Sequence, residues 1–105
     1  MDVKSWIEKT GIDTSENRAL KPPGYPYIII DVEESTRGDD ITNAGILEQT
    51  VTLELYSDKL NALAEKKVEI AFDEIERDYA KRRRWIDDQK LYMTNYSFLV
   101  VEKVR

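Results

Sequence analysis

The chain has 105 residues, with 21 acidic and 16 basic side chains, a formal net charge of −5, and neither cysteine nor histidine. Disulfides, thiolate metal sites and histidine-based acid–base catalysis are therefore excluded. No apolar run approaches the roughly 20 residues that span a bilayer. The first residues also lack the apolar stretch of a signal peptide, so we expect a protein made and kept in a cytoplasm until it assembles.

The first residues predict a short helix over 3–9. Asp2 is a suitable N-cap, Trp6 and Ile7 share one face, and Gly11 follows where helices commonly end. A helix this short is not stable alone. We therefore expect Trp6 and Ile7 to pack on the rest of the domain.

Two strands separated by a long loop are predicted next. After an irregular, proline-rich connection over 12–26, the β-branched run 27–32 predicts a first strand. Apolar and polar residues alternate over 47–56, which predicts a half-buried second strand. The polar stretch 35–46 between them is longer than a usual hairpin loop. Loops of this length in compact domains are usually functional or disordered.

A long helix is predicted from Ser57 or Asp58 to about Asp78. Its apolar residues fall at spacings of three and four, which gives the helix one wide apolar face. These residues are Leu60, Leu63, Ala64, Val68, Ala71, Phe72, Ile75 and Tyr79.

The last quarter predicts a hairpin over 80–101 with a four-residue turn. That turn places Trp85 opposite Tyr92, an aromatic cross-strand pair that contributes roughly 0.5–1.5 kcal/mol beyond burial. The aromatic residues Tyr92, Tyr96 and Phe98 share one face of the last strand. Stacking on single-stranded bases is one use for such a stripe, but packing under the long helix is the favoured interpretation.

Together these segments predict a single small α+β domain over 1–105, in the order α-β-β-α-β-β. We expect a mixed or antiparallel four-stranded sheet packed on one long amphipathic helix, with 1–11 as a short N-terminal helix and 35–46 as a long polar loop. An open sheet leaves two edge strands, and exposed edges invite pairing with another chain. An inter-subunit sheet is therefore the natural route to an oligomer.

The basic run Lys81-Arg82-Arg83-Arg84 is the obvious candidate for a polyanion site. On a strand, however, Arg82 and Arg84 face one way and Lys81 and Arg83 the other, so the run forms no single patch. A solvated strand, or one that forms salt bridges between subunits, is favoured over contact with a polyanion. The negative net charge also argues against a nucleic-acid binder.

The acidic residues around the polar loop raise the question of a metal site, since hard cations prefer carboxylate oxygens. Asp39 and Asp40 lie in the loop, but the spacing of a calcium-binding loop is absent. No glycine-rich phosphate loop and no nucleophile motif is present either. We expect no catalytic residue, no metal and no cofactor, and therefore a protein that is not an enzyme.

Three segments, read in order, resemble a known family. Pro22–Ile30 (PPGYPYIII) is similar to the family's proline- and tyrosine-rich lead into the first strand, and Val51–Lys59 (VTLELYSDK) is similar to its second strand and the turn into the long helix. Trp85-Ile86, a four-residue turn, Leu91-Tyr92 and then Tyr96 and Phe98 resemble its closing hairpin. These features are typical of the tail completion, or tail terminator, proteins of siphophages, especially phages and prophages of Gram-positive hosts. The resemblance spans about residues 22–104.

The resemblance implies a structural role in virion assembly. Such proteins form a ring, expected to be hexameric, at the head-proximal end of the tail, where they cap the tail tube and provide the head–tail joining surface. The implied partners are other copies of the chain, the tail-tube protein and the head–tail connector proteins, with the host cytoplasm as the place of assembly. Six copies would carry a charge of −30, so DNA would pass through without specific binding. No membrane is implied.

We predict contacts with neighbouring subunits or tail proteins from the polar loop and from one side of the basic run. The residues are Thr36, Arg37, Asp39, Asp40, Asn43, Lys81 and Arg83. The loop is expected to become ordered in such a contact. The alternative to a phage role is a small regulatory or protein-interaction α+β domain, monomeric or dimeric and unrelated to virion assembly.

Overall fold

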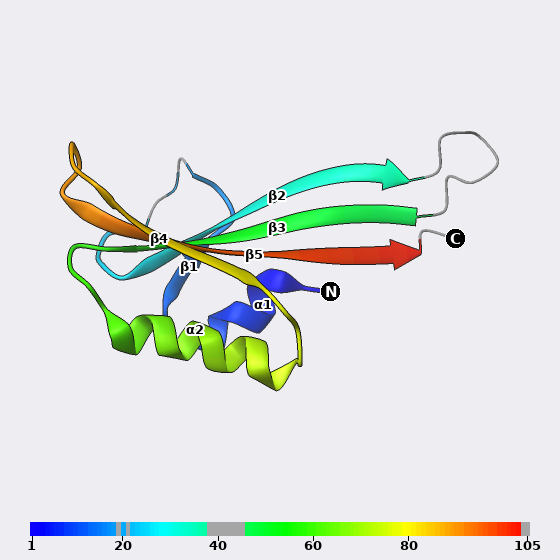
Figure 1. Cartoon of the computed structure of the whole chain (residues 1–105), viewed down its shortest axis with the longest axis horizontal. Coiled ribbons are helices and arrows are strands. Elements are labelled where there is room, and N and C mark those ends of the chain that lie inside the picture. The colour runs from blue at the N-terminus through cyan, green and yellow to red at the C-terminus, as the bar shows by residue number, and fades with distance from the viewer. Residues whose placement is uncertain (19, 21, 38–45, 104–105) are drawn as a thin grey trace.

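The computed structural model describes residues 1–18, 20, 22–37 and 46–103, and only the backbone of 35–37, 46, 47, 102 and 103. The described elements form a mixed five-stranded sheet with two helices on one face (Figure 1). They are α1 Val3–Glu8, β1 Asp13–Ser15, β2 Tyr27–Arg37, β3 Ile46–Ser57, α2 Ala62–Glu74, β4 Ala80–Ile86 and β5 Leu91–Lys103. We call the side of the sheet that carries α1 and α2 the helix face and the other side the outer face.

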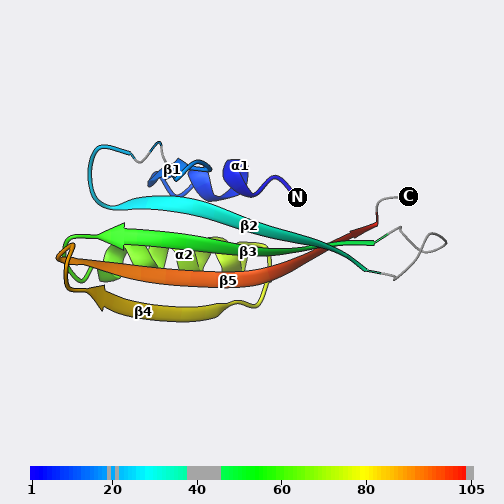
Figure 2. The ribbon, with the colours of Figure 1, turned by 90° about the horizontal axis from the view of Figure 1, so that it is seen from above.

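The strand order is β1-β2-β3-β5-β4, so β4 lies at one edge of the sheet. β1 pairs with β2 in parallel, and all other neighbours are antiparallel. The predicted hairpin is confirmed: Trp85 lies opposite Tyr92, with ring centroids 4.8 Å apart. Figure 2 shows β2, β3 and β5 running side by side well beyond the helices.

The α+β class is confirmed, but the prediction of four strands was wrong. The fifth strand is β1, which lies in the segment predicted to be an irregular connection. Its residues Asp13-Thr14-Ser15 pair with Tyr27–Ile29. A strand of three polar residues at the edge of a sheet has no apolar alternation, because its contribution is backbone pairing rather than burial. The sequence pattern therefore could not reveal it.

The predicted boundaries of the long helix were also wrong. β3 continues through Ser57, and α2 begins only after Asn61, whose Oδ1 accepts a hydrogen bond from the Ala64 amide at 3.0 Å. Leu63, assigned to the apolar face, is 66% exposed. The helix ends before Glu76, which adopts a left-handed backbone with φ 51°. The start was misplaced because Ser57 is still paired in β3, and the side chain that caps the helix is that of Asn61.

The predicted loop over 35–46 is partly strand, because β2 runs to Arg37 and β3 begins at Ile46. Ser35, Thr36 and Arg37 are all polar, so this end of β2 shows no apolar alternation. A prediction based on apolar alternation therefore takes this paired part of β2 for a loop. Residues 38–45 lie outside the described part of the chain.

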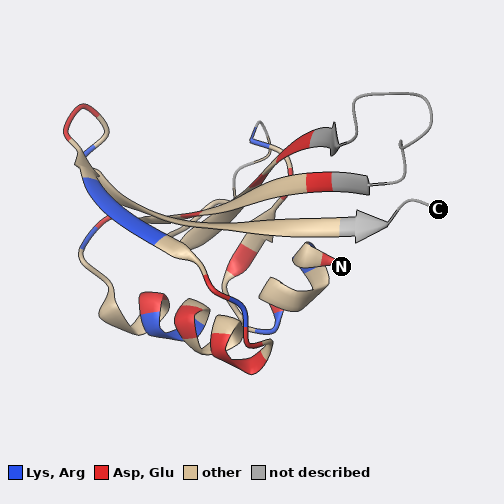
Figure 3. Ribbon diagram, turned by 45° about the vertical axis from the view of Figure 1, so that its right-hand side comes forward, with Lys and Arg blue, Asp and Glu red and all other residues tan. Residues whose placement is uncertain are grey.

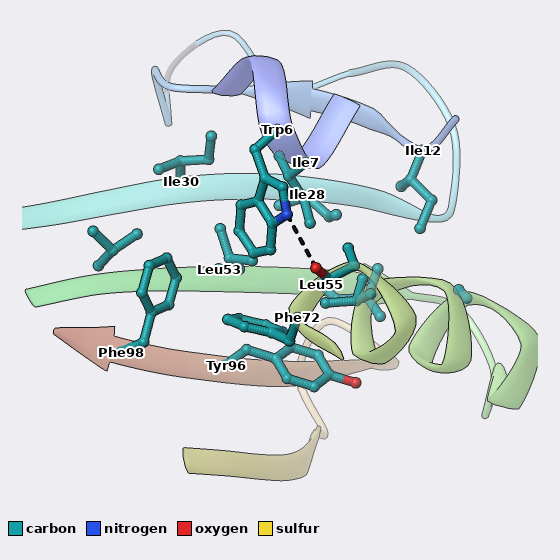
Figure 4. Close-up of a cluster of buried hydrophobic side chains, with 14 of the residues drawn as sticks. Trp6, Ile7, Ile12, Ile28, Ile30, Leu53, Leu55, Phe72, Tyr96 and Phe98 are labelled. Atoms are coloured by element: carbon teal, nitrogen blue, oxygen red, sulfur yellow. Dashed lines mark hydrogen bonds between the residues drawn. The ribbon is translucent and has the colours of Figure 1, made fainter. Parts of the chain in front are cut away.

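The core lies between the sheet and both helices and contains the aromatic residues Trp6, Phe72, Tyr96 and Phe98 (Figure 4). Trp6 packs edge-on against Phe72 at 5.0 Å and Phe98 at 5.8 Å. Its indole Nε1 donates a hydrogen bond to the Ala71 carbonyl at 3.1 Å. The short α1 is therefore held by its tertiary contacts, as predicted, and Tyr96 and Phe98 are core residues.

Candidate subunit-interaction surface

The basic run lies on the edge strand β4, and its side chains alternate between the two faces as predicted. In the register of β4 with β5, Lys81 lies opposite Tyr96 and Arg83 opposite Thr94, both on the helix face. Arg82 lies opposite Asn95 on the outer face. The run is therefore divided into two pairs with different surroundings.

Lys81 and Arg83 form ion pairs within the subunit. Arg83 donates from Nε and Nη2 to the carboxylate of Glu65 at 2.8 and 2.6 Å. The Lys81 Nζ lies 2.9 Å from Glu65 Oε1 and 2.6 Å from Glu69 Oε2. These contacts tie the edge strand to α2. The prediction that Lys81 and Arg83 contact other subunits stays a prediction, and their charges are already partnered in the free chain.

Glu65 is a buried carboxylate with a complete set of partners. Only 8% of its side chain is exposed, and Thr94 donates a further hydrogen bond to Oε2 at 3.1 Å. The hydrogen bonds from Arg83 lower the pKa of Glu65 from its ordinary value of 4.5 to about 2, against the effect of burial. This carboxylate is therefore ionised at neutral pH and, together with Glu69, balances the charges of Lys81 and Arg83.

Arg82 and Arg84 project from the outer face of β4 and are exposed. Within the described part of the chain neither side chain makes a hydrogen bond or an ion pair. Trp85, on the helix face of the same strand, is 45% exposed and donates its Nε1 to Asp87 at 3.2 Å. β4 thus presents Arg82 and Arg84, without ion-pair partners among the described residues, on its outer face and the partly exposed indole of Trp85 on its helix face.

The opposite edge of the sheet is acidic. β1 covers only Tyr27–Ile29 of β2, so among the described residues the rest of the outer edge of β2 has no partner strand. Asp31 and Glu33 project from the outer face there, and Val32 and Glu34 from the helix face. Asp31 lies 3.9 Å from Arg18, whereas Glu33 and Glu34 form no ion pair within the described residues. Figure 3 shows the basic band on β4 and the acidic band toward the far end of β2.

A second network occupies the outer face between these edges. Glu54 accepts hydrogen bonds from Arg18 at 3.0 Å and from the Tyr56 hydroxyl at 2.9 Å. Tyr56 stacks on Tyr27, with centroids 5.0 Å apart. Burial, and then the hydrogen bond to Glu54, raise the pKa of Tyr56 to about 12. Arg18, in the connection between β1 and β2, is thereby tied to the outer face of the sheet.

Two of the other predicted contact residues lie at the far end of β2. Thr36 and Arg37 lie in β2, where they pair with Leu47 and Ile46. Asp39, Asp40 and Asn43 lie outside the described residues. The sequence did not single out the charged side chains of β2 and β4 that have no ion-pair partner among the described residues, namely Arg82, Arg84, Glu33 and Glu34. The alternation along β4 already divided the run, but only the position of Glu65 shows which half is neutralised.

In the described ranges, no three acidic side chains come together in a way that could hold a metal ion. A depression of about 240 Å³ lies between the end of α1 and α2, lined by Lys9, Thr10, Lys67, Ile70, Ala71 and Glu74. Among the helices described, none is long and apolar enough to cross a membrane.

Comparison with known proteins gave no assignment. No protein-family model matches the chain, and no curated protein matches it significantly.

Proposed function

We propose that the chain is a non-enzymatic structural protein of a long-tailed bacteriophage, which caps the tail tube as a ring, expected to be hexameric, and forms the surface that joins the tail to the head. The observation that carries this proposal is the position in the fold of the three segments that resemble tail terminator proteins. Residues 22–30 lead into β2 and form its start, and residues 51–59 form the end of β3 and the turn toward α2. Residues 85–98 form the end of β4, the turn that follows it and the first part of β5.

These segments are separate in the sequence but lie next to one another in the structure. β2, β3 and β5 are adjacent strands of one sheet, and buried residues from all three segments meet in one core, among them Ile28, Leu53 and Phe98. A likeness confined to surface loops would carry little weight. A likeness that covers the central strands and their turns supports a shared architecture.

The charge distribution supports the ring. The two edges of the sheet carry opposite charges and have no strand partner in the described part of the chain, which suits repeated association of identical copies. A ring of six would carry −30 in total, so its channel would offer DNA little net attraction. In this proposal the partners are the tail-tube protein and the head–tail connector proteins, and the protein resides at the head-proximal end of the virion tail.

The deciding experiment is deletion of the coding sequence from the phage or prophage genome that carries it, followed by electron microscopy of induced lysates. We expect overlong tail tubes and filled heads that are not joined to them. Wild-type chain supplied in trans restores joined virions of normal length. A matched control supplies the same gene with a stop codon at Trp6. Joined virions with tails of normal length in the deletion strain would refute the proposal.

A further inference from the structure

We infer that copies of this chain associate head to tail through their sheet edges, with β4 of one copy added antiparallel to the outer edge of β2 of the next, beyond the part that β1 covers. This inference rests on the proposed ring and specifies the surface that builds it. The partner is a second copy of the chain.

The lengths and directions of the two edges agree. β4 has 7 residues, and β1 covers only the first three residues of the 11-residue strand β2. The free part of β2 is therefore long enough to take all of β4. Within one sheet β4 and β2 run in opposite directions, because β3 and β5 lie between them and each neighbouring pair is antiparallel. Copies in the same orientation therefore place β4 antiparallel to the next β2, so that the sheet continues from one subunit into the next.

Both faces of the proposed joint are complementary. In the continued sheet, Arg84 on the outer face of β4 lies opposite Glu33 of the next copy and diagonally across from its Asp31. On the helix face, Trp85, 45% exposed, meets Val32, 42% exposed. A register that sets Arg84 opposite Glu33 also sets Trp85 opposite Val32, because both strands advance one residue at a time in opposite directions. Opposite charges and an aromatic with a β-branched residue are favourable cross-strand pairs.

The same charges disfavour the symmetric alternatives. Pairing β4 with β4 brings the free arginines of two copies together, and pairing β2 with β2 does the same for the acids. Like charges directly opposite each other destabilise a sheet. A head-to-tail contact is the arrangement that joins unlike edges, and such a contact generates a ring when the rotation between copies closes. Lys81 and Arg83 are already paired with Glu65 within the subunit. The choice between head-to-tail and symmetric pairing therefore depends on Arg82 and Arg84.

Cysteine cross-linking tests the joint directly, since the chain contains no cysteine of its own. The double variant Glu33→Cys/Arg84→Cys is treated at high protein concentration with an oxidant or a short bismaleimide and run on denaturing gels. We expect a ladder of covalent oligomers. The matched control, Glu33→Cys/Lys66→Cys, moves one cysteine to an exposed position on α2 and should give at least about tenfold less of the ladder. An equal absence of ladder in both variants, or a dimer formed by the Arg84→Cys single variant alone, overturns the inference.

Charge reversal gives a second, independent test by native mass spectrometry of the assembled protein. Arg84→Glu alone and Glu33→Arg alone should each lower the ring population by roughly tenfold or more, because the like-charge contact repeats at every joint. An equimolar mixture of the two variants should recover it, since alternating copies restore an opposite pair at each joint in a ring with an even number of subunits. Single variants that assemble like the wild type, or a mixture that fails to recover, contradict the inference. Circular dichroism of each variant confirms that the fold is retained.

These tests separate the joint from the function. Overlong tails in the deletion strain, together with no specific ladder, refute the joint and leave the capping function standing. A specific ladder together with normal virions in the deletion strain refutes the capping function and leaves the joint standing.

Discussion

Arg83 and Glu65 form a two-point ion pair in which the guanidinium Nε and Nη2 lie 2.8 and 2.6 Å from the two carboxylate oxygens. The pair links the edge strand β4 to the buried side of α2, and Lys81 and Thr94 complete the coordination of the carboxylate. This contact is stronger than a single-point surface salt bridge, because two charge-assisted hydrogen bonds form in parallel between the guanidinium and the carboxylate.

Replacement of Glu65 by glutamine should lower the free energy of unfolding by about 1.5–3 kcal/mol, the usual worth of hydrogen bonds to a charged group. The neutral amide accepts fewer and weaker hydrogen bonds from Arg83 and Lys81. Urea denaturation of the monomer followed by circular dichroism measures the loss. Glu74→Gln, at an exposed position on the same helix, is the control and should change the stability by less than about 0.5 kcal/mol.

The contribution of Glu65 should also depend on pH. Its pKa in the folded state, about 2, lies below the ordinary value of 4.5 expected in the unfolded state. The unfolded chain therefore takes up the proton first, and the stabilisation is complete above pH 4.5 and is lost as the pH falls toward 2. The stability gap between wild type and Glu65→Gln should narrow over that range. A gap that stays constant down to pH 2 would contradict this assignment.

Substitution of Gly11 by alanine should destabilise the fold by about 1–2 kcal/mol, because Gly11 follows α1 with a left-handed φ of 82°, which side chains with a Cβ rarely adopt. The cost is conformational, since an added Cβ would meet nothing within 4 Å. Gly24→Ala is a matched control: its Cβ also meets nothing within 4 Å, and its φ lies outside the left-handed range. Equal stabilities of the two variants in urea would show that the turn after α1 is not held as described.

Replacement of Trp6 by phenylalanine should lower the free energy of unfolding by about 1–2 kcal/mol. The smaller ring still packs against Phe72, but the buried Ala71 carbonyl loses the indole donor that lies 3.1 Å away. Trp85→Phe, at a site 45% exposed, should have almost no effect on the stability of the dilute monomer. The comparison uses circular dichroism, because each variant removes one of the two tryptophan fluorophores.

The phenol of Tyr56 should ionise late in an alkaline titration. Burial and the adjacent Glu54 raise its pKa to about 12, so the difference in tyrosinate absorbance between wild type and Tyr56→Phe should develop near pH 12 rather than near the ordinary value of about 10. Since the folded-state value is the higher one, the neutral phenol stabilises the fold below pH 10 and this stabilisation is lost as the pH rises through 12. A difference signal centred near pH 10 would show that Tyr56 does not face Glu54.

The sequence predicted those parts of the fold in which burial leaves a periodic pattern. The core strand residues Val51, Leu53 and Leu55 and the aromatic pair Trp85 and Tyr92 were placed correctly. β1 was missed because three polar residues join the sheet through backbone bonds. The far end of β2 was taken for loop because Ser35, Thr36 and Arg37 are all polar and therefore show no apolar alternation. At the candidate surface the division of the basic run was foreseen, but which half is free depends on Glu65, which reaches β4 only in the folded chain.

The hydrogen bond from Trp6 to Ala71 spans 65 positions of the chain, and it has a consequence for the order of folding. The N-terminal residues leave the ribosome first, yet their docking site on α2 is synthesised much later. Closing so long a loop is slow, whereas the β4–β5 hairpin needs only local contacts. During translation the apolar face of α1 therefore stays exposed until α2 has been made. Over that time α1 is open to chaperone binding and to off-pathway aggregation.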